Sequence, residues 1–175
     1  KGFVKKTPLK AFSKISARGL VAIRIEEGDT LLNVKTCTNQ DTVIIGTRNG
    51  LSIRFNTSDL RSTGRDSRGV TAITLKGGDE LVDMDIVPFE DSETSNNYLL
   101  VVTSGGYGKR VHMDEFRVQK RGGVGLIATK FKSEKVLGGR RDAIATMKAC
   151  TDGNEVLLIT DQGNLVKLNT DKISL

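Results

Sequence analysis

The segment Gln119–Gly125 combines the residue types that bind phosphate groups. Its sequence, Gln-Lys-Arg-Gly-Gly-Val-Gly, places two adjacent bases, Lys120 and Arg121, before the glycines Gly122, Gly123 and Gly125. Glycine lets the backbone approach a ligand closely, while lysine and arginine pair with phosphate oxygens. A glycine-rich turn between strands with incidental bases is the alternative interpretation. Phosphate binding, without chemistry on a reacting group, is therefore the first hypothesis.

Positive charge is concentrated around this segment. The 175 residues carry 27 Lys and Arg against 21 Asp and Glu, a net charge of +6. Between Gly105 and Lys132 there are 7 bases and only two acids, Asp114 and Glu115. Such a local excess is typical of a surface that meets a phosphate backbone, although basic stretches also occur on ordinary solvated faces.

Residues for catalysis are not evident. Tyr98 begins an apolar run and is expected in the core, and Tyr107 lies in a glycine-rich turn. The dipeptide Gly108-Lys109 lacks the Ser or Thr that must follow in a phosphate-binding loop, because Arg110 stands there. We therefore expect a chain that is not itself an enzyme.

Metal and cofactor sites are not expected either. Asp83 and Asp85 alternate with apolar residues, which predicts one exposed strand face rather than a metal site. Cys37 and Cys150 lie far apart with no Cys-x-x-Cys spacing, and we expect two buried free thiols. The single histidine, His112, has no partner in the pattern, so no cofactor is assigned.

Neither a membrane span nor a signal peptide is apparent. No apolar run approaches the roughly 20 residues that a membrane helix needs. The first 14 residues are basic but contain no uninterrupted apolar stretch. We therefore expect no contact with a membrane.

A glycine followed four residues later by a base recurs four times within apolar or β-prone runs. The glycines at 2, 50, 106 and 163 are spaced by 48, 56 and 57 residues, and their bases are Lys6, Arg54, Arg110 and Lys167. A second mark repeats in step, since Arg18–Ile23 is echoed by Arg68–Ile73 and more loosely by Val124–Ile127. A period of this length indicates a repeat architecture in which neighbouring units complete each other's cores.

Each repeat is predicted to contain about four strands. In the middle unit these are Gly50–Phe55, Val70–Leu75, Leu81–Val87 and Tyr98–Thr103, and Gly-Asp or Gly-Gly turns separate such runs. Single helical turns are expected at Ser58–Arg61, Asp114–Arg117 and Thr170–Ile173, and a long exposed loop at Phe89–Asn97. Four-stranded units at this period predict propeller-like blades.

The expected organisation is one all-β repeat domain over 1–175, with repeats at 1–47, 48–104 and 105–161 and a partial repeat at 162–175. The chain starts on what looks like the second strand of a hairpin. Since three blades rarely close a ring, we expect a piece of a longer protein, a partial disc of about three blades.

The heptapeptide resembles the signature box, Gln-(Lys/Arg)-Arg-Gly-Gly-(Lys/Arg)-Gly, of the C-terminal domain of DNA gyrase A. Six of its seven positions match, and Val124 stands where the family has a base. The segments Gly106–Arg110, Ser67–Ile73 and Leu158–Gly163 are also similar to repeated motifs of that domain. This resemblance extends over essentially the whole chain.

The resemblance implies a β-pinwheel, a six-bladed propeller-like disc that exchanges hairpins between blades and wraps double-stranded DNA around its basic rim. It also implies the rest of gyrase A, together with gyrase B, as partners in the holoenzyme. A cytoplasmic location at the bacterial nucleoid or in a plastid is implied as well, with a strand-cutting tyrosine and an ATP site elsewhere. Candidate DNA-binding bases are Lys6, Arg18, Arg54, Arg65, Arg68, Lys109, Arg110, Lys120, Arg121 and Lys167, with Gln119, Gly122, Gly123 and Gly125 completing the box.

Two other functions remain open at this point. The substitution at Val124 leaves room for the homologous C-terminal domain of topoisomerase IV, which bends DNA without strong chiral wrapping. A protein-binding propeller scaffold is the alternative from another class, with the acidic segment Glu90–Glu93 or an apolar patch as its contact.

Overall fold

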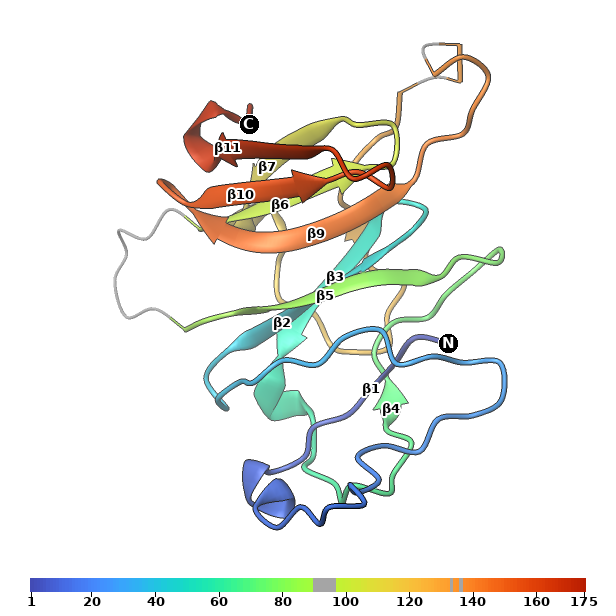
Figure 1. Ribbon diagram of the computed structural model, residues 1–175, viewed down its shortest axis with the longest axis vertical. Coiled ribbons are helices and arrows are strands. Elements are labelled where there is room, and N and C mark those ends of the chain that lie inside the picture. The colour runs from blue at the N-terminus through green and yellow to red at the C-terminus, as the bar shows by residue number, and fades with distance from the viewer. Residues whose placement is uncertain (90–96, 133, 136) are drawn as a thin grey trace.

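The computed structural model describes residues 1–89, 97–132, 134–135 and 137–175, which form strands and short 3₁₀ turns (Figure 1). The predicted loop at Phe89–Asn97 lies mostly outside the described residues. The strands are β1 (Phe3–Val4), β2 (Thr42–Thr47), β3 (Leu51–Asn56), β4 (Val70–Thr71), β5 (Leu81–Val87), β6 (Asn97–Thr103), β7 (Gly108–His112), β8 (Leu126–Ile127), β9 (Ile144–Thr151), β10 (Glu155–Ile159) and β11 (Leu165–Asn169).

These strands form four antiparallel sheets that follow one another along the long axis of the molecule (Figure 1). A four-stranded sheet has the order β5-β2-β3-β8, and a three-stranded sheet has the order β7-β6-β9. The pair β1-β4 lies on one side of them and the pair β10-β11 on the other. The all-β, propeller-like fold predicted from the repeats is confirmed.

Short 3₁₀ turns follow the second strand of each hairpin. The turns η2 (Thr57–Asp59), η3 (Met113–Glu115) and η4 (Thr170–Lys172) lie at the three places where single turns are predicted, and η1 (Leu9–Phe12) is additional. The three predicted turns follow β3, β7 and β11 directly, so they mark equivalent points of successive repeats.

Sheets are completed by strands from the next repeat. β4 pairs with β1, not with β3, and β8 pairs with β3, with Ser52 opposite Leu126. The predicted four-stranded middle unit is therefore wrong. Val70–Leu75 contributes only the strand Val70–Thr71, which pairs with β1, and Tyr98–Thr103 belongs to the sheet β7-β6-β9. Local patterning defines a strand but leaves the choice of its partner to tertiary packing.

Glycine permits this exchange of strands. Gly125 precedes β8 with a φ of +81°, and a Cβ there would lie 2.5 Å from the carbonyl oxygen of Ser52. Gly69 precedes β4 in the same way against Val4. The close approach that we expected toward a ligand is, at Gly125, an approach to the neighbouring hairpin.

Gly125→Ala is expected to lower the free energy of unfolding by about 2–3 kcal/mol, because strain in the left-handed region adds to the clash with Ser52. Gly28→Ala is the matched control, since Gly28 has a φ of +73° but no atom within 4 Å of the added Cβ. Urea titration of both variants measures the difference. Equal losses would mean that the close approach to Ser52 contributes nothing.

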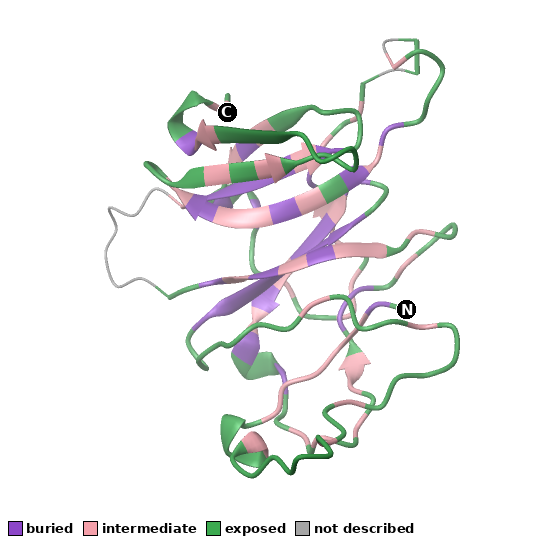
Figure 2. Cartoon of the chain, viewed as in Figure 1, coloured by how far each residue is buried: buried purple, intermediate pink, exposed green. Residues whose placement is uncertain are grey.

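The hydrophobic core lies between the sheets, so the central strands are buried on both faces (Figure 2). On β2, Ile44 packs toward the three-stranded sheet, whereas Val43 and Ile45 pack toward β1 and β4. Tyr98 is buried as predicted, in a third cluster with Leu100 and Cys150. Each sheet thus needs its neighbours to bury its apolar side chains.

Two sequence predictions about burial are wrong. Cys37 is exposed, and only Cys150 is a buried thiol. Asp83 and Asp85 are 6% and 8% exposed, so they do not belong to a solvated strand face. The error at the two acids arises because an alternating strand pattern is the same whether solvent or the next sheet covers its polar face. Cys37 was assigned from its residue type, which does not show whether a neighbouring sheet covers it.

In the part of the chain that the structure describes, no helix has the length and apolarity needed to cross a membrane.

Candidate nucleic-acid interface

The box segment Gln119–Gly125 is attached to the two preceding sheets through its backbone. The N–H of Gln119 donates to the carbonyl of Arg54 at 2.8 Å, and that of Gly122 donates to the carbonyl of Ala72 at 2.6 Å. The N–H of Thr74 donates in turn to the carbonyl of Gly123 at 2.8 Å. These bonds fix the backbone of the box, so its side chains project from a rigid base.

The box segments are Gln119–Gly125 and the equivalent segments Thr63–Gly69 and Ser13–Gly19 of the two earlier repeats. An arginine links each of the two later segments to the one before it. Arg121 donates from Nη1 to the carbonyl of Thr71 at 3.1 Å, and Arg65 donates to the carbonyl of Val21 at 3.2 Å. Thr71 and Val21 each lie two residues after the glycine of the preceding segment. Arg121 is exposed and Arg65 is half-buried, so both guanidinium groups retain free donors at the surface.

The base missing from position 124 is present in the two earlier repeats. The N–H of Thr63 donates to the carbonyl of Lys6, as the N–H of Gln119 donates to the carbonyl of Arg54, so Thr63 and Gln119 are equivalent. Counting five residues on from each places Arg68 at the position of Val124. The repeated Arg-Gly dipeptide places Arg18 there as well. Arg68 pairs with Glu26 at 2.5 Å and covers the Phe3 ring at 4.6 Å, whereas Arg18 is exposed.

Three of the four bases that follow the turn glycines have a different role, since Lys6, Arg54 and Arg110 each contact the 3₁₀ turn of the next repeat. Lys6 donates from Nζ to the carbonyl of Thr57 in η2 at 2.7 Å and to Asn39 at 2.9 Å. Arg54 donates to the carbonyl of Met113 in η3 at 3.1 Å. Burial lowers the pKa of Arg54, an effect that the nearby carboxylate of Asp114 opposes.

Arg110 is the most enclosed of these bases. It is 7% exposed, donates from Nε to the carbonyl of Ile173 beside η4 at 3.0 Å, and pairs with Asp152 at 2.7 Å. Its guanidinium carbon lies 4.6 Å from the centre of the Tyr98 ring. These contacts occupy the side chain inside the molecule, away from any ligand at the surface.

The ten candidate bases therefore fall into three groups. Arg18, Arg65, Arg68, Lys120 and Arg121 belong to the box segments. Lys6, Arg54 and Arg110 connect successive repeats. Sequence reasoning missed this role, because a base that recurs once per blade is equally compatible with binding DNA at the rim and with a contact between repeats. Lys109 is half-buried, and Lys167 is exposed and paired with Glu155 at 2.7 Å.

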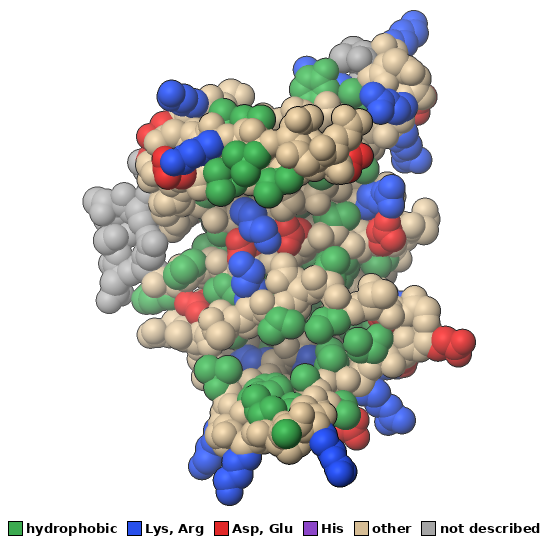
Figure 3. All heavy atoms as spheres, viewed as in Figure 1, with side chains coloured by type: hydrophobic (Ala, Val, Ile, Leu, Met, Phe, Trp, Pro, Cys, Tyr) green, Lys and Arg blue, Asp and Glu red, His purple; other side chains and the backbone are tan. Residues whose placement is uncertain are grey.

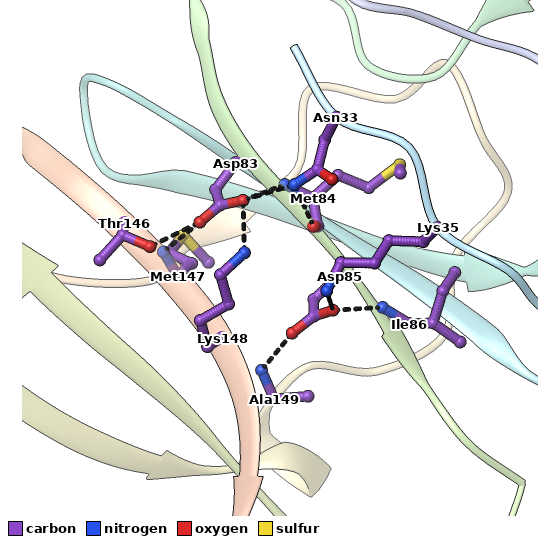
Figure 4. Close-up of polar contacts among 10 residues, drawn as sticks. All are labelled: Asn33, Lys35, Asp83, Met84, Asp85, Ile86, Thr146, Met147, Lys148 and Ala149. Carbon is purple, nitrogen blue, oxygen red and sulfur yellow. Dashed lines mark hydrogen bonds and ion pairs between the residues drawn. The ribbon is translucent and has the colours of Figure 1, made fainter. Parts of the chain in front are cut away.

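Carboxylates of β5 join the two large sheets (Figure 4). Asp83 accepts hydrogen bonds through Oδ2 from the Met147 N–H at 3.1 Å and the Thr146 hydroxyl at 2.6 Å, and through Oδ1 from Lys148 Nζ at 2.9 Å. Asp85 accepts from the Ala149 N–H at 3.1 Å. The two side chains thus take the place of a partner strand along the free edge of β9.

Positive side chains of the first repeat and of β9 face these acids. Lys35 pairs with Asp85 at 3.0 Å, and Lys148 pairs with Asp83 at 2.9 Å. Burial alone would raise the pKa of Asp83, but hydrogen bonds from Thr146, Lys148 and Met147 outweigh burial and lower it. The residues that the structure describes include no cluster of three His, Cys, Asp or Glu side chains placed to hold a metal.

The fold and these segments define a class of protein, the repeat domains that complete each propeller-like blade with a strand from the next repeat. The chain matches the family described as DNA gyrase C-terminal domain, beta-propeller, over residues 1–38, 41–88, 97–140 and 154–175. It belongs to that family.

Similar proteins agree with this assignment. Over 99% of the chain, it is 34% identical to the DNA gyrase A protein of Synechocystis sp. and 35% identical to that of Staphylococcus epidermidis. The chain spans only 23% and 18% of these two relatives.

Two solved structures share the fold over 99% of this chain. A DNA gyrase A C-terminal domain aligns with a TM-score of 0.82 at 26% identity, and this chain covers 54% of it. The C-terminal domain of a DNA topoisomerase IV aligns with a TM-score of 0.85 at 22% identity, with 51% covered. The described blades therefore correspond to about half of those domains.

Proposed function

We propose that this chain binds double-stranded DNA along its box segments and bends it, as a non-catalytic part of a type IIA topoisomerase. The observation that carries the proposal is the series of box segments, which present Arg18, Arg65, Arg68, Lys120 and Arg121 at repeated positions. Backbone hydrogen bonds to a preceding strand hold the second and third of these segments. Phosphate contacts from bases of this kind are independent of base sequence.

Successive contacts of this kind can hold a bent duplex. Bending 20–30 base pairs smoothly by 40–90° costs about 1–6 kcal/mol, so several phosphate contacts must offset that energy. The box segments are linked through Arg121 to Thr71 and through Arg65 to Val21, which fixes the spacing of the bases before DNA binds. Preorganised cations lose little side-chain freedom on binding.

The remaining partners follow from the family. The rest of gyrase A, together with gyrase B, would supply the strand-cutting tyrosine and the ATP site, and this domain would present DNA for strand passage and negative supercoiling. A location at the nucleoid in the cytoplasm, or in a plastid, is part of the same proposal.

A variant with Arg18→Ala, Lys120→Ala and Arg121→Ala is expected to bind duplex DNA at least about tenfold more weakly at 0.1 M salt. Its plot of log K against log salt should be shallower by about 2–3, since each phosphate contact contributes roughly 0.9 to the slope. Lys6, Arg54 and Arg110 are left unchanged because they hold the fold. Filter binding over a series of salt concentrations measures both quantities.

The matched control removes the same charge from exposed turns outside the box segments, with Arg48→Ala, Lys76→Ala and Lys172→Ala. If the slope falls equally in both variants, the box segments contribute only to the general positive charge of the molecule and are not a specific DNA contact. Failure of the unaltered chain to bind any duplex at about 0.15 M salt would instead favour a protein-binding scaffold.

The second candidate is the topoisomerase IV type of domain, favoured by Val124 at a position where Arg18 and Arg68 stand in the other repeats. Ligation of nicked circular DNA with increasing protein distinguishes the two. A shift in linking number toward positive writhe indicates chiral wrapping of the gyrase type. Tight, salt-sensitive binding without that shift indicates bending alone.

A further inference from the structure

A basic loop connects β8, the strand that follows the box of the third repeat, to β9. Nine residues, 72–80, separate β4 from β5, whereas sixteen residues, 128–143, separate β8 from β9. Figure 1 shows the described residues of this longer connection, in orange, beyond the sheets at the upper right. We define the basic loop as the described residues 130–132, 134–135 and 137–141.

The loop is fixed at its base. Asp142 accepts hydrogen bonds through Oδ1 from the N–H of Gly105 at 2.9 Å and the hydroxyl of Ser104 at 3.2 Å, both in the turn between β6 and β7. Leu137 packs against the same turn: a Cβ added at Gly105 would lie only 2.8 Å from the Leu137 side chain. The base of the loop therefore does not depend on a ligand for its position.

The tip of the loop forms a turn of its own. The N–H groups of Leu137 and Gly139 donate to the carbonyl of Glu134 at 3.1 and 2.8 Å. The Nζ of Lys132 lies 5.7 Å from the centre of the Tyr107 ring, and this contact connects the loop to the β6–β7 turn. The described residues of the loop are thus held next to the β6–β7 turn.

The charge of the loop is almost entirely positive. Its cations are Lys130, Lys132, Lys135, Arg140 and Arg141, and its one acid is Glu134. All five cations are exposed, and no ion pair joins any of them to a carboxylate of the described residues. Figure 3 shows positive side chains spread over this projection.

Equivalent turns of the other two repeats lack this excess of bases. Asp79 accepts from the Asn49 N–H at 2.9 Å as Asp142 does from Gly105, so the turn Lys76–Glu80 corresponds to the end of the loop. Apart from the aspartate that all three repeats share, that turn contains Lys76 and Glu80, and the first repeat has Glu26 and Glu27 at its turn. Among the described residues, only the third repeat therefore offers an anion a favourable site on this side of the molecule.

We propose that the basic loop is a second DNA contact, which binds the backbone of the duplex beside the third repeat. The inference rests on the proposed binding of DNA by the box segments. Only Ala128 and Thr129 separate β8 from Lys130, so a duplex that follows the box Gln119–Gly125 passes the base of the loop. The turns of the first two repeats have no comparable excess of bases, which leaves the third repeat as the point where DNA turns toward this side.

Site-specific crosslinking tests where the duplex lies. Arg140→Cys and, as the matched control on the equivalent acidic turn, Glu80→Cys are made in a Cys37→Ser background, since Cys37 is the exposed thiol. Each is labelled with an azidophenacyl group and irradiated with a linear duplex. We expect a crosslink from residue 140 that disappears at high salt, and none from residue 80.

A binding measurement tests the contribution of the loop. The variant with Lys130, Lys132, Lys135, Arg140 and Arg141 all changed to Gln should show a salt slope smaller by about 2–3, because cations on one side of a loop reach about that many phosphates. Its thermal melting should match that of the unaltered chain, since none of the five side chains is buried.

The outcomes separate the two proposals. An unchanged slope together with no crosslink from residue 140 overturns the loop contact but leaves binding by the box segments intact. No duplex binding by the unaltered chain overturns both. A crosslink from residue 140 together with an unchanged slope in the loop variant means that the loop lies near the duplex without binding it, and also overturns the contact.

Discussion

Asp83→Ala is expected to lower the free energy of unfolding by about 3–4 kcal/mol, the cost of removing a buried hydrogen-bonded carboxylate. The change leaves the N–H of Met147 and the hydroxyl of Thr146 without their acceptor at the junction of β5 and β9. It also removes the partner of Lys148. Urea unfolding at neutral pH measures the loss.

Asp161→Ala provides the control, because it removes the same charge from an exposed turn and should change stability by less than about 0.5 kcal/mol. Equal stability of the two variants would show that the carboxylate does not join the sheets. A large loss confined to Asp83→Ala would support the junction seen in Figure 4.

The same carboxylate gives a pH dependence of known sign. Since the pKa of Asp83 is lowered in the folded chain, its contribution is complete above the ordinary pKa of about 4 and is lost as the pH falls through the folded value. Melting temperatures between about pH 3 and 7 should fall steeply on the acid side. Asp83→Asn should flatten that fall, because one carboxylate no longer needs to be protonated.

Arg110→Ala is expected to destabilise the chain by about 3–4 kcal/mol, because a charged hydrogen bond and the packing of the buried stem are lost together. The carbonyl of Ile173 loses its donor, and Tyr98 loses the guanidinium above its ring. Urea unfolding of the purified variant measures this loss directly.

Two neighbouring changes make that result specific. Arg110→Lys should cost less, since Lys6 makes the corresponding contact with Thr57 in the first repeat. Lys109→Ala removes the same charge one residue earlier, from a half-buried side chain, and should change stability little. An Arg110→Ala variant that folds normally but binds DNA weakly would show that Arg110 belongs to the DNA-binding surface.

Local patterns in the sequence predicted much of the fold. The strand Leu81–Val87 is found at the predicted bounds and Tyr98–Thr103 is extended by one residue, because short β-prone runs between turn residues have few alternatives. The repeated glycines and the box indicated the architecture and the family for the same reason. Each is a feature of a few adjacent residues.

Pairing and burial required the tertiary structure. The sequence could not show that Val70–Thr71 pairs with β1, because partners so distant along the chain are chosen by packing. Nor could it show that Asp83 faces β9, since a carboxylate on alternate strand positions fits solvent and a neighbouring sheet equally well. The bases at Lys6, Arg54 and Arg110 were ambiguous in the same way.

The sequence by itself therefore determined the repeat, the strands, the turns and the composition of the box, all of which depend on local spacing. The tertiary structure alone decided which bases clamp the repeats together and which remain at the surface. The physical reason is that burial and hydrogen bonding depend on what lies opposite a side chain. In this fold the residue opposite comes from a different repeat.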